Sequence, residues 1–217
     1  MRKILQNAFF KSGLGARLLL LSFALPYLIA QAGHYSHTFE LFPVAAFSPF
    51  LVWKGEVWRL LSYAFLPLGI LDWLISLFWF STLVFVLERI WSGRELWLYC
   101  LLSALVASIL LVLLKQPAFP YAGNGAMILA LIAAWVRFYG KERIILLGFG
   151  EMSVRQAALV VTIIEVLILV FTGGLAVTLA MLCGGFTGWL YLFLRGKHFL
   201  NRRSRVLDSE RIARLEI

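Results

Sequence analysis

The chain consists of long apolar runs separated by short polar connections. The apolar runs cover residues 18–31, 68–87, 96–114, 123–136, 156–171 and 175–194. A helix that crosses a bilayer needs about 20 mostly apolar residues. The pattern therefore predicts an all-α polytopic membrane protein with six transmembrane helices, of which the first and the fourth are short.

The fourth run begins with four small residues, Ala122, Gly123, Gly125 and Ala126. Small residues let helix backbones approach each other closely inside a membrane. We therefore expect the fourth helix to lie buried among the other helices. The glycines Gly184 and Gly188 of the sixth run are expected to pack closely against Gly123 and Gly125 for the same reason.

The distribution of basic residues predicts the orientation of the chain. With a cytoplasmic N-terminus, all but three of the 20 Lys and Arg residues fall on the cytoplasmic side, and the exceptions are Lys54, Arg59 and Lys115. Cytoplasmic loops are enriched in Lys and Arg, so we expect both termini in the cytoplasm. This asymmetry accounts for the net charge of +9 without nucleic acid, and the basic side is expected to contact anionic lipids.

The predicted topology divides the chain into a cytoplasmic segment, 1–15, a six-span domain, 16–195, and a basic cytoplasmic tail, 196–217. Within the domain, residues 34–67 form a long connection that is rich in Phe and Trp, and aromatic residues favour the membrane interface. We expect this connection to lie partly sunk in the membrane as short helices. One alternative concerns Ala30-Gln31-Ala32, which resembles a signal-peptidase site. Cleavage there would leave five spans.

Composition narrows the class of protein further. The chain is 62% hydrophobic and 14% charged, whereas a soluble domain is about 45–50% apolar and about 25% charged. This excludes a soluble globular protein, a disordered chain and a coiled coil. The two cysteines, Cys100 and Cys183, lie in apolar runs, so we expect neither a disulfide framework nor a metal site. The sequence gives no sign of a cofactor.

Several short motifs occur in a recognisable order. They are Glu56-x-Trp58-Arg59-Leu60-Leu61-Ser62-x-x-Phe65, Leu87-Glu88-Arg89, Gly93, Tyr99, Ala122-Gly123-Asn124-Gly125-Ala126 and Gly184-x-x-x-Gly188. With this order and spacing, residues 16–195 resemble the rhomboid family of intramembrane serine proteases. The resemblance implies a six-helix bundle with an amphipathic, membrane-embedded first loop. It also implies structural roles for Glu56, Trp58, Arg59, Glu88, Gly93, Gly184 and Gly188.

The chain departs from the rhomboid pattern at the catalytic positions. The resemblance places Asn124 at the position of the nucleophilic serine, and a carboxamide is not an activatable nucleophile. Met181, or Leu182 with a shift of one residue, stands at the position of the histidine base. The three histidines are His34, His37 and His198, so none lies between residues 38 and 197.

The positions that resemble the oxyanion-binding pair of the family are Asp72 and Ser76. An ionised Asp72 would repel a developing oxyanion, where catalysis needs a hydrogen-bond donor. We therefore expect a rhomboid-like pseudoprotease that is not an enzyme. We also expect the Asn124 amide to hydrogen-bond across the former active site, because buried amides usually find partners.

Glu165 stands in the middle of the fifth apolar run. A carboxylate at the centre of a membrane costs about 2.5–3.5 kcal/mol on insertion scales. Such residues are usually functional, so Glu165 is a candidate for binding a partner. The alternative is a protonated acid that is hydrogen-bonded within the bundle.

Three functions remain open from the sequence. The leading hypothesis is a non-catalytic protein that binds transmembrane helices of client or partner proteins, in quality control, assembly or scaffolding. The second is an intramembrane serine endopeptidase with displaced catalytic residues, for which Ser62, Ser76 and Ser81 are available. The third is an ion or solute path that uses Asp72 and Glu165. Because no organellar presequence is evident, the sequence favours a bacterial inner membrane.

Overall fold

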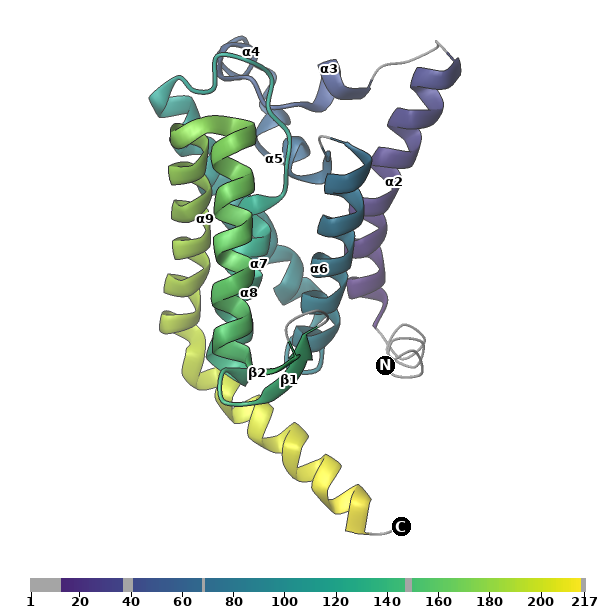
Figure 1. Ribbon diagram of the computed structural model, residues 1–217, viewed down its shortest axis with the longest axis vertical. Helices are drawn as coiled ribbons and strands as arrows, with labels where there is room; N and C mark the ends of the chain where they lie inside the picture. Colours follow the sequence, from purple (N-terminus) through teal and green to yellow (C-terminus); the bar gives the residue numbers. More distant parts are fainter. Residues whose placement is uncertain (1–12, 37–40, 68, 147–149, 216–217) are drawn as a thin grey trace.

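The computed structural model describes residues 13–36, 41–67, 69–146 and 150–215. Its long elements are helices that run roughly side by side (Figure 1). They are α2 (Leu14–Ser36), α6 (Ile70–Glu88), α7 (Gly93–Leu114), α8 (Gly125–Tyr139) and α9 (Val154–Leu215).

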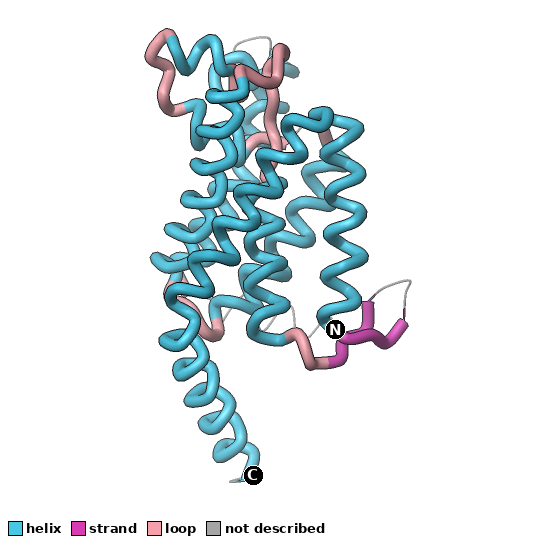
Figure 2. The backbone as a smooth tube through the Cα atoms, turned by 90° about the vertical axis from the view of Figure 1, so that its left-hand side faces the viewer, coloured by secondary structure: helices cyan, strands magenta, loops and turns pink. Residues whose placement is uncertain are grey.

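Helix α9 is broken at Gly174. Gly174 has φ 76° and ψ 179°, a conformation that a residue with a Cβ rarely adopts. The break separates a first half, Val154–Phe171, from a second half, Gly173–Arg195. The helix then continues to Leu215, and its C-terminal part extends away from the bundle (Figure 2).

Four of these helical segments are long and apolar enough to cross a membrane, namely α6, α7 and the two halves of α9. This confirms the prediction of an all-α polytopic membrane protein at the level of its class. Two shorter apolar helices, Gly15–Gln31 within α2 and Gly125–Tyr139, fall below the length of a full span. That they also cross the membrane stays a prediction.

Helix α8 is the most deeply buried helix of the bundle. Eleven of its 15 residues are buried, and it packs against α6, α7 and both halves of α9. A helix shorter than the membrane is thick can be accommodated when its neighbours surround it. The prediction from the small residues at its start, that this helix lies buried among the others, is therefore confirmed.

The close contacts of the glycine motif differ in detail from the prediction. Gly184 faces Ala126, and Gly188 faces Ala130 and the Tyr99 hydroxyl. A Cβ on Gly188 would lie 2.6 Å from the Ala130 Cβ. The partners on α8 are thus alanines, because Gly125 faces the first half of α9 instead.

One element was missing from the predicted all-helical architecture. Strands β1 (Arg143–Leu146) and β2 (Gly150–Ser153) form a two-stranded antiparallel sheet between α8 and α9, with Arg143 opposite Ser153. The run of β-branched residues that includes Ile144 favours extended backbone. It is too short to show the alternation that a strand prediction needs.

The connection after α2 folds into short elements. They are α3 (Leu41–Ala45), α4 (Pro49–Trp53), α5 (Arg59–Ser62) and a 3-10 turn, η1 (Tyr63–Phe65). These elements lie at one end of the bundle, and the hairpin of β1 and β2 lies at the other, together with the start of α2 and the extension of α9 (Figure 1). Phe50 and Trp53 of α4 are exposed.

Candidate functional site

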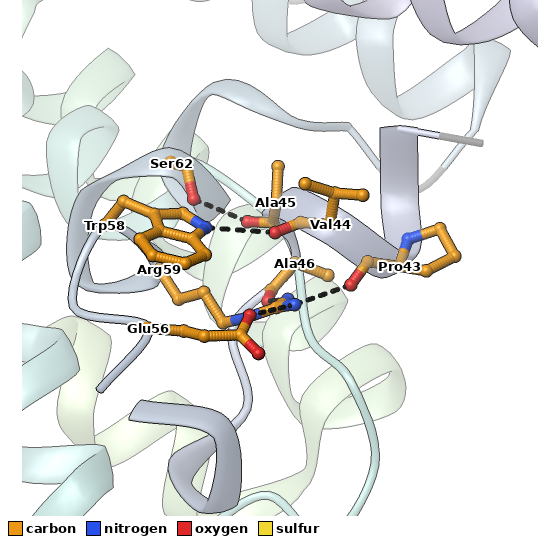
Figure 3. Close-up of polar contacts among 8 residues, drawn as sticks. All are labelled: Pro43, Val44, Ala45, Ala46, Glu56, Trp58, Arg59 and Ser62. Atoms are coloured by element: carbon orange, nitrogen blue, oxygen red, sulfur yellow. Dashed lines mark hydrogen bonds and ion pairs between the residues drawn. The ribbon is translucent and has the colours of Figure 1, made fainter. Parts of the chain in front are cut away.

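Arg59 is the centre of a polar cluster in the connection between α2 and α6 (Figure 3). Its guanidinium is almost fully buried and forms an ion pair with Glu56, with 2.7 Å between the Nη2 and Oε2 atoms. The remaining donors reach the main chain, since Nη1 donates to the Ala46 carbonyl and Nη2 donates to the Pro43 carbonyl. The charge is therefore compensated by a carboxylate and by two carbonyl oxygens.

Two further side chains of the same motif donate to the intervening carbonyls. The Trp58 Nε1 donates to the Val44 oxygen at 3.2 Å, and the Ser62 hydroxyl donates to the Ala45 oxygen at 2.7 Å. The last carbonyls of a helix have no partner within the helix. The motif thus supplies donors to four consecutive carbonyls at the C-terminus of α3, which fixes the short helices to one another.

This connection is also joined to the segment before α8. Phe47 and Tyr121 exchange backbone hydrogen bonds of 2.7 and 2.9 Å, and the Gly123 N–H donates to the Tyr63 carbonyl at 3.1 Å. Gly123 has φ 140°, which explains the glycine at this position. Burial raises the pKa of the Tyr63 phenol, so Tyr63 remains a neutral donor to the Ala104 carbonyl.

Sequence analysis did not single out Tyr63 or Tyr121. The pKa of Tyr121 is raised, chiefly by burial and further by the nearby Tyr63, Glu165 and Asp72. Tyr121 therefore lies close to a second polar cluster, at the start of α8. The sequence signal that could have identified Tyr121 is its position next to the motif Ala122-Gly123-Asn124. This signal is weak, because aromatic residues are common throughout the chain.

Asn124, which the sequence resemblance predicts at the position of the rhomboid nucleophile, immediately precedes α8 and is only 4% exposed. The Ser76 hydroxyl of α6 lies 3.2 Å from the Asn124 Oδ1 and 3.4 Å from the Asp72 Oδ1. Its one proton can serve one of these oxygens at a time. The structure therefore brings together three of the positions expected at a former active site, Asp72, Ser76 and Asn124.

The other side of the Asn124 amide is not matched. Its Nδ2 atom is buried and has no hydrogen-bond partner among the residues that the structure describes. Buried polar groups are usually hydrogen-bonded, and exceptions call for an explanation. The expected hydrogen bond across the site therefore involves the amide oxygen. The amide nitrogen has no partner among the described residues.

Glu165 approaches the same place from the first half of α9. A Cβ on Gly125 would lie 3.1 Å from the Glu165 Oε1, so glycine at position 125 makes room for this carboxyl group. The Asp72 carboxyl group acts electrostatically on Glu165. Asp72 belongs to α6, Glu165 belongs to α9, and Asn124 immediately precedes α8.

Neither candidate for the base position supplies a proton acceptor. Met181 is fully buried, and Leu182 is exposed. Met181 lies three residues before Gly184, which places both on the same face of the helix, toward α8. The side chains of His34, His37 and His198 lie outside the described part of the structure.

The three serines that a displaced mechanism could use all serve other groups. Ser62 donates to the Ala45 carbonyl, Ser81 donates to the Phe78 carbonyl within α6, and Ser76 lies against Asn124 and Asp72. None of these contacts involves a histidine or a lysine that could activate the hydroxyl.

The remaining motif residues lie at the opposite end of the bundle. The Glu88 carboxyl group, at the end of α6, is near the backbone N–H groups of Gly13 and Ala16 at the start of α2. Gly93 contacts Gly15, and a Cβ on either glycine would lie 2.5 Å from the other backbone. Negative charge at a helix N-terminus is stabilising, so Glu88 holds the start of α2 against α6. The close contact between Gly93 and Gly15 holds α2 against α7.

Comparison with protein families gives a match over most of the chain. The model of a family described as "Eukaryotic integral membrane protein (DUF1751)" matches residues 17–209. The chain belongs to this family. The DUF1751 family is part of the rhomboid-like superfamily, which agrees with the coarser part of the resemblance seen in the sequence.

Membership in DUF1751 corrects one expectation. The family description names eukaryotic proteins, and this speaks against the predicted bacterial inner membrane. The inference had rested on the lack of a recognisable presequence, which is a weak signal because internal transmembrane helices can themselves direct insertion. That the protein is an integral membrane protein is supported by both the family and its apolar helices. Comparison with curated proteins gives no match.

Proposed function

We propose that this protein is a non-catalytic rhomboid-like membrane protein that binds transmembrane helices of client or partner proteins. The observation that supports this most strongly is Asn124. It occupies the start of α8, where the rhomboid resemblance places a nucleophile, and Ser76 holds its amide oxygen. No histidine occurs between residues 38 and 197, so α6, α7, α8 and the first half of α9 carry no imidazole base.

The arrangement of the helices supports lateral docking. Helix α6 packs against α2 and α8, whereas α9 packs against α7 and α8. Helix α6 and the first half of α9 thus flank the start of α8, and both carry exposed apolar residues, such as Ile75 and Ile164. A client helix that docks here would bury apolar surface without being cleaved. In this proposal both termini are cytoplasmic, and α3 to α5 lie in the opposite leaflet.

The proposal is tested by site-specific photocrosslinking in native membranes. A photoreactive residue at Ile75 of α6 or at Ile164 of α9 should give adducts with other membrane proteins. Leu113 of α7 and Phe193 of α9 are matched controls, because both are exposed, at 69% and 72%. Equal labelling from all four positions would mean that the contacts are random collisions, and the proposal would fail.

Catalysis is tested separately with the purified protein. A fluorophosphonate probe should leave it unlabelled, because Ser62, Ser76 and Ser81 contact no histidine or lysine in the described contacts. Labelling that disappears in Ser76→Ala would instead establish a displaced serine protease.

An ion path is the second candidate, because Asp72 acts electrostatically on Glu165. A path would need polar groups along the rest of the bundle, and the residues of α8 below Asn124 are apolar until Arg137. Proton flux into proteoliposomes that is abolished by Glu165→Gln would favour this function over helix binding.

A further inference from the structure

Four cations occur around the C-terminal end of α8 and the neighbouring ends of the two halves of α9. They are Arg137, Lys141, Arg155 and Arg195, and all four are exposed. Within the described part of the chain, none of them forms an ion pair or donates a side-chain hydrogen bond. We call this set the basic corner. It contrasts with Arg59, whose charge is compensated by a carboxylate and by carbonyl oxygens.

Arg155 lies across the end of α8. A Cβ on Gly140, which caps this helix, would lie 3.1 Å from the Arg155 Nε and 3.2 Å from its Cγ. The Val154 N–H donates to the Glu142 carbonyl at 2.9 Å, which joins the start of α9 to the chain just after α8. Arg137 precedes Gly140 by three residues, and this spacing puts both on one side of a helix. The first half of α9 thus brings Arg155 close to the last turn of α8.

The second half of α9 contributes Arg195. It runs in the same direction as α8, because the first half of α9 returns between them, and a Cβ on Gly188 would lie 2.6 Å from the Ala130 Cβ. Seven residues are almost two full helical turns, or about 10 Å. Arg137 follows Ala130 by seven residues and Arg195 follows Gly188 by seven, so the two arginines continue the same adjoining faces. Lys141 follows Arg137 by one further turn.

The basic corner lies at the ends of membrane-spanning segments. Arg155 is the second residue of the span Val154–Phe171, and Arg195 is the last residue of the span Gly173–Arg195. The ends of spans are level with the lipid headgroups. A lipid headgroup can therefore reach these cations without leaving the bilayer.

Two simpler causes do not account for the grouping. The peptide dipoles give the C-terminus of α8 only about half a negative charge, which one cation compensates. The enrichment of Lys and Arg in cytoplasmic loops requires no grouping, and the exposed Arg89 and Arg94 fulfil it elsewhere. They flank Trp91, whose ring centroid lies 5.8 Å from that of Phe138. Phe138 precedes Gly140 by two residues, so Arg89 and Arg94 lie on nearly the opposite side of α8 from Arg155.

The charge of the corner indicates the kind of headgroup. The adjoining hairpin adds one exposed cation, Arg143, and two exposed acids, Glu142 and Glu151, so the formal charge of the region is +3. A phosphate monoester carries about −1.5 to −2 at pH 7, and a phosphodiester in the same headgroup adds one more negative charge. Arginine binds phosphate oxygens through two parallel hydrogen bonds, and three of the four cations are arginines.

We propose that the basic corner of Arg137, Lys141, Arg155 and Arg195 binds the headgroup of a phospholipid that carries a phosphate monoester. The site goes beyond the proposed function and does not depend on it. It lies around the C-terminal end of α8, whereas Asn124 precedes the N-terminal end of this helix, and it needs no partner helix.

The test uses the full chain in phosphatidylcholine vesicles with trace amounts of spin-labelled lipid. Phosphatidylinositol 4-phosphate is compared with phosphatidylinositol, which lacks the monoester, and with phosphatidylcholine. Electron paramagnetic resonance measures the fraction of each lipid that the protein immobilises. One cation near an anionic headgroup contributes roughly fivefold in affinity, so we expect phosphatidylinositol 4-phosphate to associate roughly fivefold or more tightly than phosphatidylinositol. Equal association of these two lipids would overturn the proposal.

Protein variants locate the effect. Arg137→Gln and Arg155→Gln should each lower the preference for phosphatidylinositol 4-phosphate roughly fivefold and leave the association of phosphatidylcholine unchanged. Arg94→Gln is the matched control, because it removes one exposed arginine from the other side of α8. An equal loss in Arg94→Gln would mean that the whole basic surface attracts anionic lipids, and the assignment to this corner would fail. The comparison between lipids uses the unmodified protein, so it remains decisive even where a variant does not fold.

A last arm separates a lipid from free phosphate. An excess of inorganic phosphate, compared with chloride at equal ionic strength, should leave the preference unchanged, because the acyl chains confine the lipid beside the protein. Displacement by inorganic phosphate would assign the corner to a soluble anion and overturn its assignment to a lipid. These outcomes are independent of the crosslinking from Ile75 and Ile164, which tests helix binding.

Discussion

Two polar clusters lie at the same end of the bundle and differ in how completely they are satisfied. Around Arg59, the guanidinium, the Trp58 indole and the Ser62 hydroxyl all have partners within the connection that contains them. Around Asn124, the amide nitrogen has none among the described residues, and two acids lie near each other. The first cluster stabilises the fold of the connection. In the second, one buried hydrogen-bond donor has no partner among the described residues.

This comparison predicts its largest effect at Arg59. Arg59→Ala leaves Glu56 without its cation and removes the donors to the Pro43 and Ala46 carbonyls. Breaking a buried ion pair costs about 3–5 kcal/mol, and the partial exposure of Glu56 favours the lower end. Thermal unfolding in mild detergent should shift strongly downward, whereas Lys54→Ala, an exposed control, should leave it unchanged. A small shift for Arg59→Ala would mean that the cluster does not fasten the connection.

The second effect concerns the packing that holds α8 in place. In Gly188→Val the new side chain would meet the Ala130 Cβ and the Tyr99 hydroxyl, which lie 2.6 and 2.7 Å from the Cβ position. Overpacking of this kind costs about 1–3 kcal/mol. The same thermal measurement should show a clear loss, and Gly69→Ala, which meets nothing within 4 Å, is the control. An unchanged transition in Gly188→Val would show that α9 can move away from α8 without cost.

Asn124 should respond much less than Arg59, although both are buried. Asn124→Leu removes the hydrogen bond from Ser76, but it also removes a buried donor that lacks a partner. Unsatisfied buried groups cost about 1–3 kcal/mol, so the two changes offset each other to within about 1 kcal/mol. A loss of stability as large as that of Arg59→Ala would show that the amide nitrogen is satisfied after all.

The smallest change in stability is expected at Glu165. Glu165→Leu removes a partly exposed acid from an apolar helix, and such acids oppose insertion. The variant should therefore be at least as stable as the unmodified protein in thermal unfolding, while losing partner adducts in the crosslinking experiment. Unchanged adducts together with unchanged stability would remove Glu165 from the binding site.

The sequence by itself determined the membrane class and the approximate limits of the helices, because apolar runs of this length cannot remain in water. From the order of motifs it also predicted that Asn124 stands at the position of the rhomboid serine. It failed to predict the hairpin at Arg143–Ser153, where the strands are too short for a periodic pattern.

Only the tertiary structure decided which polar groups meet. Asp72, Asn124 and Glu165 are far apart in the chain, and their proximity depends on how α6, α8 and α9 pack. The same holds for the glycines, since Gly184 and Gly188 contact alanines while Gly125 faces Glu165. The length of an apolar run is a property of one segment and is visible in its sequence. Whether a polar group finds a hydrogen-bond partner depends on the distances between helices, and the sequence of a single segment does not specify them.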